Sequence, residues 1–137
     1  NKSRMAGIKA VVAYYAPTDL KDIFISDNKS IFSRFATRKT IKANPKSKEE
    51  IYDYYSPINW ISKNMVPCLL VHGKLDDVVP FNSTVKFSQK LKDYNIKHIF
   101  LVHKNGNHSF DTKLNDIATV KILERTARFI KRAFNET

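Results

Sequence analysis

Residues 66–80 read VPCLLVHGKLDDVVP, and this stretch decides the fold of the chain. The run Cys68–Val71 is short and apolar, which predicts a strand buried on both faces. Gly73 then lets the chain turn sharply, and Asp76 and Asp77 come directly after the turn. Open α/β sheets place their chemistry in loops at the carboxyl ends of buried parallel strands. The stretch therefore predicts a functional loop at the end of a central strand.

The same pattern recurs further along the chain. Ile99–Val102 is a second apolar run, and the sequence GNHSF at 106–110 then places His108 on a loop. Because the carboxyl ends of parallel strands meet at one edge of a sheet, we expect Asp76 and His108 to lie close together. An imidazole can carry a proton near neutral pH, and a carboxylate can orient it. We therefore expect the two residues to be two members of a charge-relay site.

The order of the predicted elements indicates the α/β class. Ile8–Ala16 is rich in β-branched and aromatic residues and predicts a strand, and residues 21–48 predict one or two short helical pieces. A short helix is predicted over 48–55, and an amphipathic helix of roughly three to four turns is predicted after Pro80. From about residue 115 an apolar stripe with helical spacing predicts a last helix: Val120, Leu123, Ala127, Ile130 and Phe134. Strands alternating with helices predict a parallel sheet with right-handed crossovers.

The chain carries a strong positive charge. Its 137 residues suit one domain, and the formal net charge is +11. Residues 29–48 hold basic side chains and no acidic one: Lys29, Arg34, Arg38, Lys39, Lys42, Lys46 and Lys48. Such a stretch can contact nucleic acid or another anionic surface. Since no nucleic-acid-binding motif accompanies it, we interpret the stretch as a solvated face and do not expect nucleic acid as a partner.

Other features of the composition exclude whole classes of structure. Cys68 is the only cysteine, so no disulfide can form within the chain. We interpret it as a small buried hydrophobic residue. No apolar run approaches the eighteen or so residues of a membrane span. We assign no cofactor and no metal site.

Four segments carry a resemblance to a known superfamily. They are YAPTDL at 15–20, SPI at 56–58, the stretch 66–80 and GNHSF at 106–110. In this order and spacing they resemble the α/β-hydrolase superfamily, in its esterase/lipase branch of acetyl-esterase and hormone-sensitive-lipase-like enzymes. The resemblance covers essentially the whole chain and is weakest over 21–48. It implies that residues 1–137 form the C-terminal part of a single α/β-hydrolase domain. They would hold the last three parallel strands of its sheet with flanking helices, and an irregular basic helical insert at about 21–48.

The resemblance also implies roles for the two loop residues. The superfamily's acid lies in a His-Gly-x-x-Asp-x-x-Val-Pro pattern, which selects Asp76 and leaves Asp77 as a solvated acid. His108 matches the histidine, which acts as general base and then as general acid. We expect a structural role for His72 at the strand end, and we assign no role to His103.

No residue of the chain fits the superfamily's nucleophile, a serine framed by small residues two positions before and after it. None of the serines has such flanks, and Cys68 lies in the buried strand. The superfamily's layout places this serine just before the strand that matches Ile8–Ala16. We therefore expect the serine and the oxyanion loop to lie upstream of the chain, and the chain alone to be inactive. The Ile8–Ala16 edge would then be covered by an N-terminal half of the protein or by self-association.

The function that the resemblance implies is that of a serine hydrolase. The chain would be the acid-and-histidine half of an enzyme that cleaves a small carboxylic ester through an acyl-enzyme. A fragment of a serine peptidase of the prolyl-oligopeptidase type is one alternative, because such a peptidase shares this half of the fold. A non-catalytic, hydrolase-derived interaction module is another.

Overall fold

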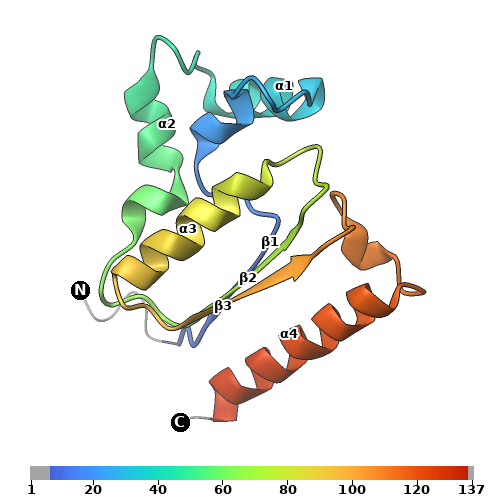
Figure 1. The fold of residues 1–137 in the computed structure, drawn as a ribbon. Coiled ribbons are helices and arrows are strands. Elements are labelled where there is room, and N and C mark those ends of the chain that lie inside the picture. The colour runs from blue at the N-terminus through green and yellow to red at the C-terminus, as the bar shows by residue number, and fades with distance from the viewer. Residues whose placement is uncertain (1–6, 136–137) are drawn as a thin grey trace.

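The computed structural model describes residues 7–135, which form a three-stranded parallel sheet covered by helices (Figure 1). The strands are β1 (Val11–Tyr14), β2 (Cys68–Gly73) and β3 (His98–His103), in the order β1-β2-β3. Both pairings are parallel, and Val71 lies opposite Tyr14 on one side and Leu101 on the other. The predicted fold class is confirmed.

The central strand β2 is buried along its whole length, as the sequence predicted. Its side chains alternate between the two faces of the sheet. Cys68 and Leu70 belong to one apolar cluster, and Leu69 and Val71 belong to another. Such a strand needs a cover on both faces, which explains its continuous apolar sequence.

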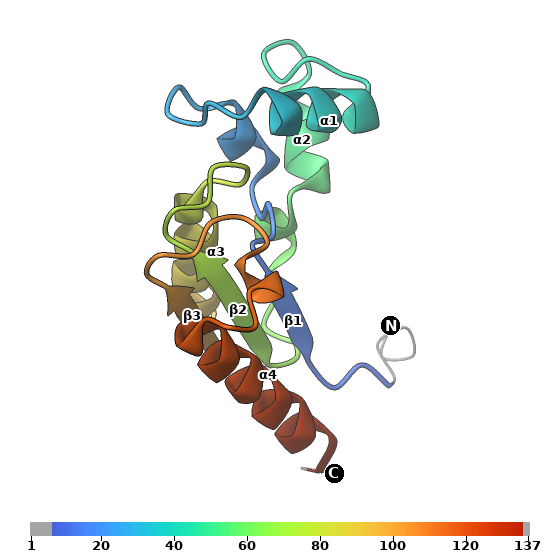
Figure 2. The ribbon, with the colours of Figure 1, turned by 90° about the vertical axis from the view of Figure 1, so that its right-hand side faces the viewer.

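One helix covers each face of the sheet (Figures 1 and 2). Helix α3 (Phe81–Asp93) packs Phe87 and Leu91 against the face that carries Leu70. Helix α4 (Ile117–Asn135) packs Ile122 against the opposite face. The sequence predicted both helices.

The first part of the segment between β1 and β2 lies beyond the carboxyl ends of the strands (Figure 2), and its last part returns along the sheet to the start of β2. The segment holds four short elements: η1 (Leu20–Phe24), α1 (Ile31–Ile41), α2 (Glu49–Tyr55) and η2 (Pro57–Trp60), of which η1 and η2 are 3₁₀ helices. The fully buried Tyr52 of α2 meets the Phe24 ring of η1 edge-on, with ring centroids 5.6 Å apart. A short helix η3 (Phe110–Thr112), also 3₁₀, follows β3.

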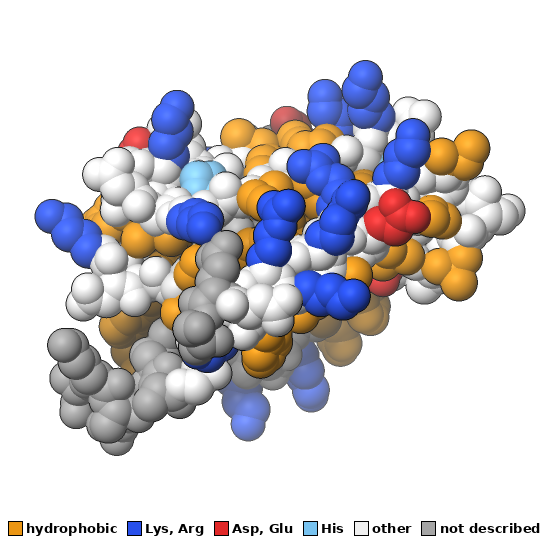
Figure 3. All heavy atoms as spheres, turned by 90° about the horizontal axis from the view of Figure 1, so that it is seen from below, with side chains coloured by type: hydrophobic (Ala, Val, Ile, Leu, Met, Phe, Trp, Pro, Cys, Tyr) orange, Lys and Arg blue, Asp and Glu red, His pale blue; other side chains and the backbone are white. Residues whose placement is uncertain are grey.

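The packing face of α4 differs from the stripe that hydrophobic periodicity selected. The buried residues are Thr119, Ile122 and Thr126, whereas Ile130 and Phe134 of the stripe are exposed. The two threonine hydroxyls are hydrogen-bonded in the interior, so they can be buried at little cost. Apolar side chains interleaved with basic ones are therefore left on the face seen in Figure 3.

The free edge of the sheet belongs to β1. Val11 and Val12 each keep 38% of their surface exposed, and β2 is the only strand that pairs with β1 within residues 7–135. Of the helices in the same range, none combines the length and apolarity needed to cross a membrane. These residues also contain no group of three or more His, Cys, Asp or Glu side chains that could hold a metal ion.

Two glycines bring the loops after β2 and β3 into backbone contact. The Leu75 amide donates to the Gly106 carbonyl at 2.9 Å, and the Lys74 amide donates to the His103 carbonyl at 2.9 Å. A Cβ at Gly73 would overlap the Gly106 carbonyl, and a Cβ at Gly106 would lie 2.8 Å from the His103 Cβ. The absence of a side chain at Gly73 lets the two loops touch, and its absence at Gly106 leaves room for the His103 side chain.

Gly73→Ala is expected to destabilise the protein, because the added methyl collides with backbone that cannot rotate away. Overpacking of this kind costs about 1–3 kcal/mol, measured as a lower unfolding free energy in urea. Lys74→Ala is the matched control, since Lys74 is exposed and its backbone bond is kept. Equal stability of the two variants would contradict the constraint on Gly73.

Candidate active site

Asp76 lies in the turn that follows β2, and backbone amides of the next residues hold its carboxylate in place. The Val78 and Val79 amides donate to Oδ1 at 2.9 and 2.8 Å. The carboxylate side chain is fully buried, whereas the neighbouring Asp77 is exposed. The structure therefore separates the two acids as the sequence predicted, with one fixed and one solvated.

His72, in strand β2, contacts the Asp76 carboxylate. Its imidazole is completely buried, with Nε2 3.2 Å from Asp76 Oδ2 and 3.1 Å from the Val79 carbonyl oxygen. Both partners of Nε2 are acceptors, so this nitrogen carries a proton and donates it. Nδ1 then accepts from the Thr84 hydroxyl at 2.6 Å. The structural role predicted for His72 includes direct contact with the candidate acid.

These contacts set the charge state of Asp76. Burial by itself raises the pKa of the carboxyl group, but hydrogen bonds from His72, the Val79 amide, His108 and the Val78 amide lower it by more. The net pKa lies below the ordinary value of 3.8. Asp76 is therefore ionised at neutral pH although it is shielded from water.

The structure brings His108 directly to Asp76. His108 Nδ1 lies 3.0 Å from Oδ2 and 3.2 Å from Oδ1, and the imidazole is 29% exposed. Because a carboxylate only accepts, Nδ1 holds the proton in the neutral ring, and Nε2 is left with its lone pair. No hydrogen bond joins Nε2 to another of residues 7–135. This is the geometry of a histidine ready to take a proton.

Tyr15 is a member of this site that the sequence analysis did not single out. Its ring lies 4.4 Å from the His108 ring, centroid to centroid, and its hydroxyl donates to Asp111 Oδ1 at 2.9 Å. Burial, followed by this bond to a carboxylate, raises the pKa of Tyr15. Its backbone φ of 35° is rare for a residue other than glycine. Strained residues of this kind gather at functional sites.

His103, to which we had assigned no role, forms a second pair with an acid. Its Nε2 lies 2.5 Å from Asp116 Oδ2, and Asp116 also accepts from the Ala118 and Thr119 amides at the start of α4. The hydrogen bond from His103 is the main cause that lowers the pKa of Asp116 to about 2. This pair ties the end of β3 to the start of α4. Its partners are far apart in sequence, so no local pattern indicates it.

The fold and the Asp76–His108 pair together define a protein of the α/β-hydrolase type. The chain belongs to the BD-FAE family, whose profile matches residues 1–91.

Among curated relatives, the non-reducing polyketide synthase stbA of Stachybotrys bisbyi is 36% identical over 64 residues, which is 44% of this chain and 3% of that protein. Esterase LipC of Mycobacterium tuberculosis is 26% identical over 108 residues, which is 76% of this chain and 26% of that protein. The chain thus spans a small part of the length of these relatives.

Two solved structures show the same fold at 23% sequence identity. The match to the Pyrococcus horikoshii acylaminoacyl peptidase covers 90% of this chain and 20% of the peptidase chain, with a TM-score of 0.77. The match to a truncated carbohydrate esterase from gut microbiota covers 88% of this chain and 43% of the esterase chain, with a TM-score of 0.64. At this identity the likeness concerns the fold alone.

Asp76→Asn is expected to reverse the tautomer of His108. The Val78 and Val79 amides keep the side-chain oxygen of the new Asn, so its NH₂ group takes the place of Oδ2 and points a donor at His108 Nδ1. His72 Nε2 then loses this acceptor and keeps the Val79 carbonyl oxygen. His108 Nδ1 must then accept, and the proton moves to His108 Nε2. Two-bond ¹H–¹⁵N correlation spectra of the neutral rings report this directly. Asp77→Asn is the control, and an unchanged tautomer in Asp76→Asn would contradict the geometry.

Asp116 is expected to make stability depend on pH on the acid side. Its pKa is lowered to about 2 in the folded protein, against about 3.9 for an unfolded aspartate. Its contribution is therefore complete above about pH 4 and is lost as the pH falls toward about 2. Urea unfolding between pH 2.5 and 6 should show a shallower acid-side slope for Asp116→Asn than for Asp77→Asn. Parallel curves for the two variants would contradict this role.

Proposed function

We propose that this chain supplies the acid and the histidine of a serine hydrolase that cleaves carboxylic esters. The observation that carries the proposal is the Asp76–His108 pair. The acid is buried, ionised and held by backbone amides, and the histidine keeps Nε2 unbonded and its ring partly exposed. A charge-relay pair needs an ionised acid that orients the histidine and a histidine nitrogen that can take a proton.

The reaction follows from the tautomer of His108. A serine Oγ attacks the ester carbonyl carbon, and His108 Nε2 takes the serine proton. The imidazolium, stabilised by Asp76, then gives this proton to the departing alcohol as the C–O bond breaks, and an acyl-enzyme remains. Water attacks the acyl-enzyme while Nε2 takes one of its protons, and the same proton returns to serine as the acid is released.

We propose that this serine and the oxyanion donors lie outside residues 1–137. Two observations support this. No serine of the sequence has small residues on both sides in the pattern of the superfamily's nucleophile, and His108 forms no hydrogen bond to a serine or cysteine within residues 7–135. The matching segment is also only 43% of the carbohydrate esterase chain and 20% of the acylaminoacyl peptidase chain.

The segment that carries the serine would cover the free edge of β1. That edge exposes valine side chains and backbone groups without a strand beside them, and an apolar edge of this kind pairs readily with another strand. A second copy of the chain is the alternative cover, as the sequence analysis expected. The oligomeric state by sedimentation distinguishes the two, because self-association predicts a dimer of residues 1–137.

A serine peptidase is the second candidate function. This candidate is favoured because the acylaminoacyl peptidase has the same fold, and its TM-score of 0.77 is higher than the 0.64 of the carbohydrate esterase. Both reactions use the same acyl-enzyme and differ in the leaving group, an alcohol or an amine. An assay with matched ester and amide substrates therefore separates them.

The test uses the protein as encoded, with any residues that precede Asn1, and compares hydrolysis of p-nitrophenyl acetate with that of a peptide p-nitroanilide. Replacement of His108 by Ala should lower kcat by about 10⁶-fold, the loss found when a histidine of this kind is removed. Asp76→Asn should lower it by about 10⁴-fold, because the wrong tautomer predominates.

Asp77→Asn is the control and should keep the parental rate, since Asp77 is exposed and outside the pair. We also expect residues 1–137 alone to show no turnover above buffer. Undiminished hydrolysis in both His108→Ala and Asp76→Asn would overturn the proposal. Faster cleavage of the anilide than of the ester would favour the peptidase.

A further inference from the structure

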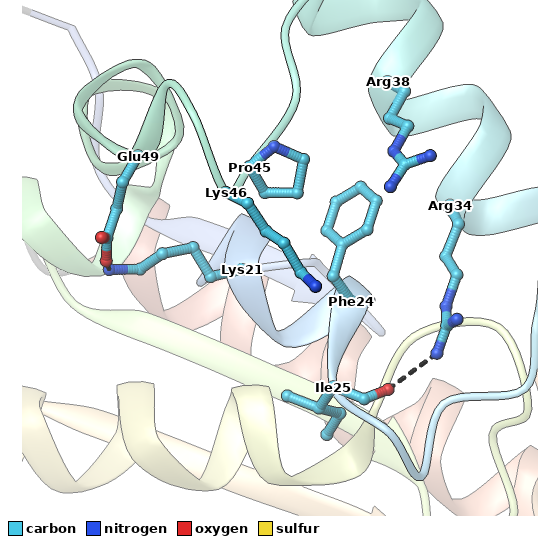
Figure 4. Close-up of a pocket in the computed structure, with 8 residues that line it drawn as sticks. All are labelled: Lys21, Phe24, Ile25, Arg34, Arg38, Pro45, Lys46 and Glu49. Atoms are coloured by element: carbon cyan, nitrogen blue, oxygen red, sulfur yellow. Dashed lines mark hydrogen bonds and ion pairs between the residues drawn. The ribbon is translucent and has the colours of Figure 1, made fainter.

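A hollow of about 590 Å³ lies in the segment between β1 and β2, apart from the Asp76–His108 pair. Elements η1, α1, α2 and the connection between the two helices surround it (Figure 4). Phe24, Ile25 and Pro45 give it apolar walls. The remaining lining residues are charged: Lys21, Arg34, Arg38, Lys46 and Glu49.

The single acid that lines the hollow is paired with a lysine. Glu49 accepts from Lys21 Nζ at 2.9 Å, and Asp53 accepts from the same nitrogen at 2.7 Å. These bonds raise the pKa of Lys21. Lys21 and Glu49 lie together at one side of the hollow in Figure 4. Lys21 offsets only one of the two carboxylates that it contacts. With Arg34, Arg38 and Lys46 the surroundings of the hollow still carry a net positive charge.

Arg34 is fixed in place with donor capacity unused. Its Nη2 donates to the Ile25 carbonyl at 2.8 Å and to the Asn28 carbonyl. Its Nε is buried and has no hydrogen-bond partner. Neither bond involves a carboxylate, so the full positive charge of the guanidinium remains. A buried donor without a partner is uncommon in folded proteins and calls for an explanation.

Arg38 and Lys46 add two more charges around the same space. The Arg38 guanidinium lies 5.4 Å from the centroid of the Phe24 ring, so a cation–π contact holds it over the hollow. The Lys46 side chain extends beside Phe24 into the same space (Figure 4). Neither side chain has a carboxylate partner among residues 7–135.

Three like charges around one hollow repel each other, and this repulsion is relieved when an anion lies between them. We propose that the hollow is a binding site for the oxyanion group of a small ligand, which is a carboxylate, a sulfate or a phosphate. Arginine forks match the geometry of such groups, and lysine adds a point charge. The apolar walls would contact the body of the ligand.

The basic run at 29–48 supplies its own controls. Arg34, Arg38 and Lys46 line the hollow, whereas Lys39 lies on the same helix as the arginines, is exposed and does not line it. A general attraction of anions to a basic surface would involve Lys39 as much as Arg38. A built site would involve only the residues that line the hollow.

The test is a titration of the full chain, followed by ¹H–¹⁵N correlation spectra, with sodium acetate, sulfate and inorganic phosphate at constant ionic strength. We expect saturable shifts in the amides of 24–25, 34–38 and Lys46 for at least one anion. Arg38→Gln and Lys46→Gln should each weaken that binding about tenfold, because each removes a charge-assisted contact. Lys39→Gln should bind as the parent does. Thermal unfolding confirms that all variants fold.

The anion that saturates identifies the source of the oxyanion. Binding of acetate supports a carboxylate ligand, and binding of sulfate or phosphate without acetate supports a sulfate or phosphate ester. Linear shifts spread over the basic surface, or equal losses in Arg38→Gln and Lys39→Gln, would overturn the proposal. So would binding of a single-stranded oligonucleotide that weakens equally in these two variants, since this indicates an extended surface and no small-ligand site.

Discussion

The candidate site depends on the contact between the loops after β2 and β3 at Gly73 and Gly106. Parallel strands lie side by side, but their loops can diverge freely once the ladder ends. Here the backbone bonds from Lys74 and Leu75 carry the pairing of β2 with β3 beyond the last strand residues. A side chain at Gly73 would force the loops apart, and one at Gly106 would collide with His103 at the end of β3. The hydrogen bond between Asp76 and His108 exists because this contact sets their separation.

Next to that contact, Asp76, His72 and His108 are joined by hydrogen bonds that favour one protonation state of each group. Asp76 is buried, which favours the neutral acid, yet the amide and imidazole donors aimed at it favour the carboxylate and prevail. His72 shares this carboxylate with His108 but is anchored on its other side by Thr84. Of these two histidines, only His108 has a ring nitrogen without a hydrogen bond to the described residues. The asymmetry between two histidines on one acid is what assigns them different roles.

The same chain leaves some surfaces without a cover. The edge of β1 and the apolar stripe of α4 are exposed, while the opposite face of α4 is buried through threonines. A domain usually buries its most apolar faces. The chain spans only a small share of each related protein.

Much of the fold could be read from local patterns in the sequence. The continuous apolar run of β2 required a sheet covered on both faces, and the spacing of the loop residues after β2 and β3 predicted that Asp76 and His108 would meet. Periodicity located α4 but selected the wrong face, because it counts apolar residues and gives no weight to threonines whose hydroxyls find partners inside. The contact of Tyr15 with His108, the His103–Asp116 pair and the hollow around Phe24 were decided only by the tertiary structure. Each joins residues from different elements, and the sequence of one element holds no information about what another brings beside it.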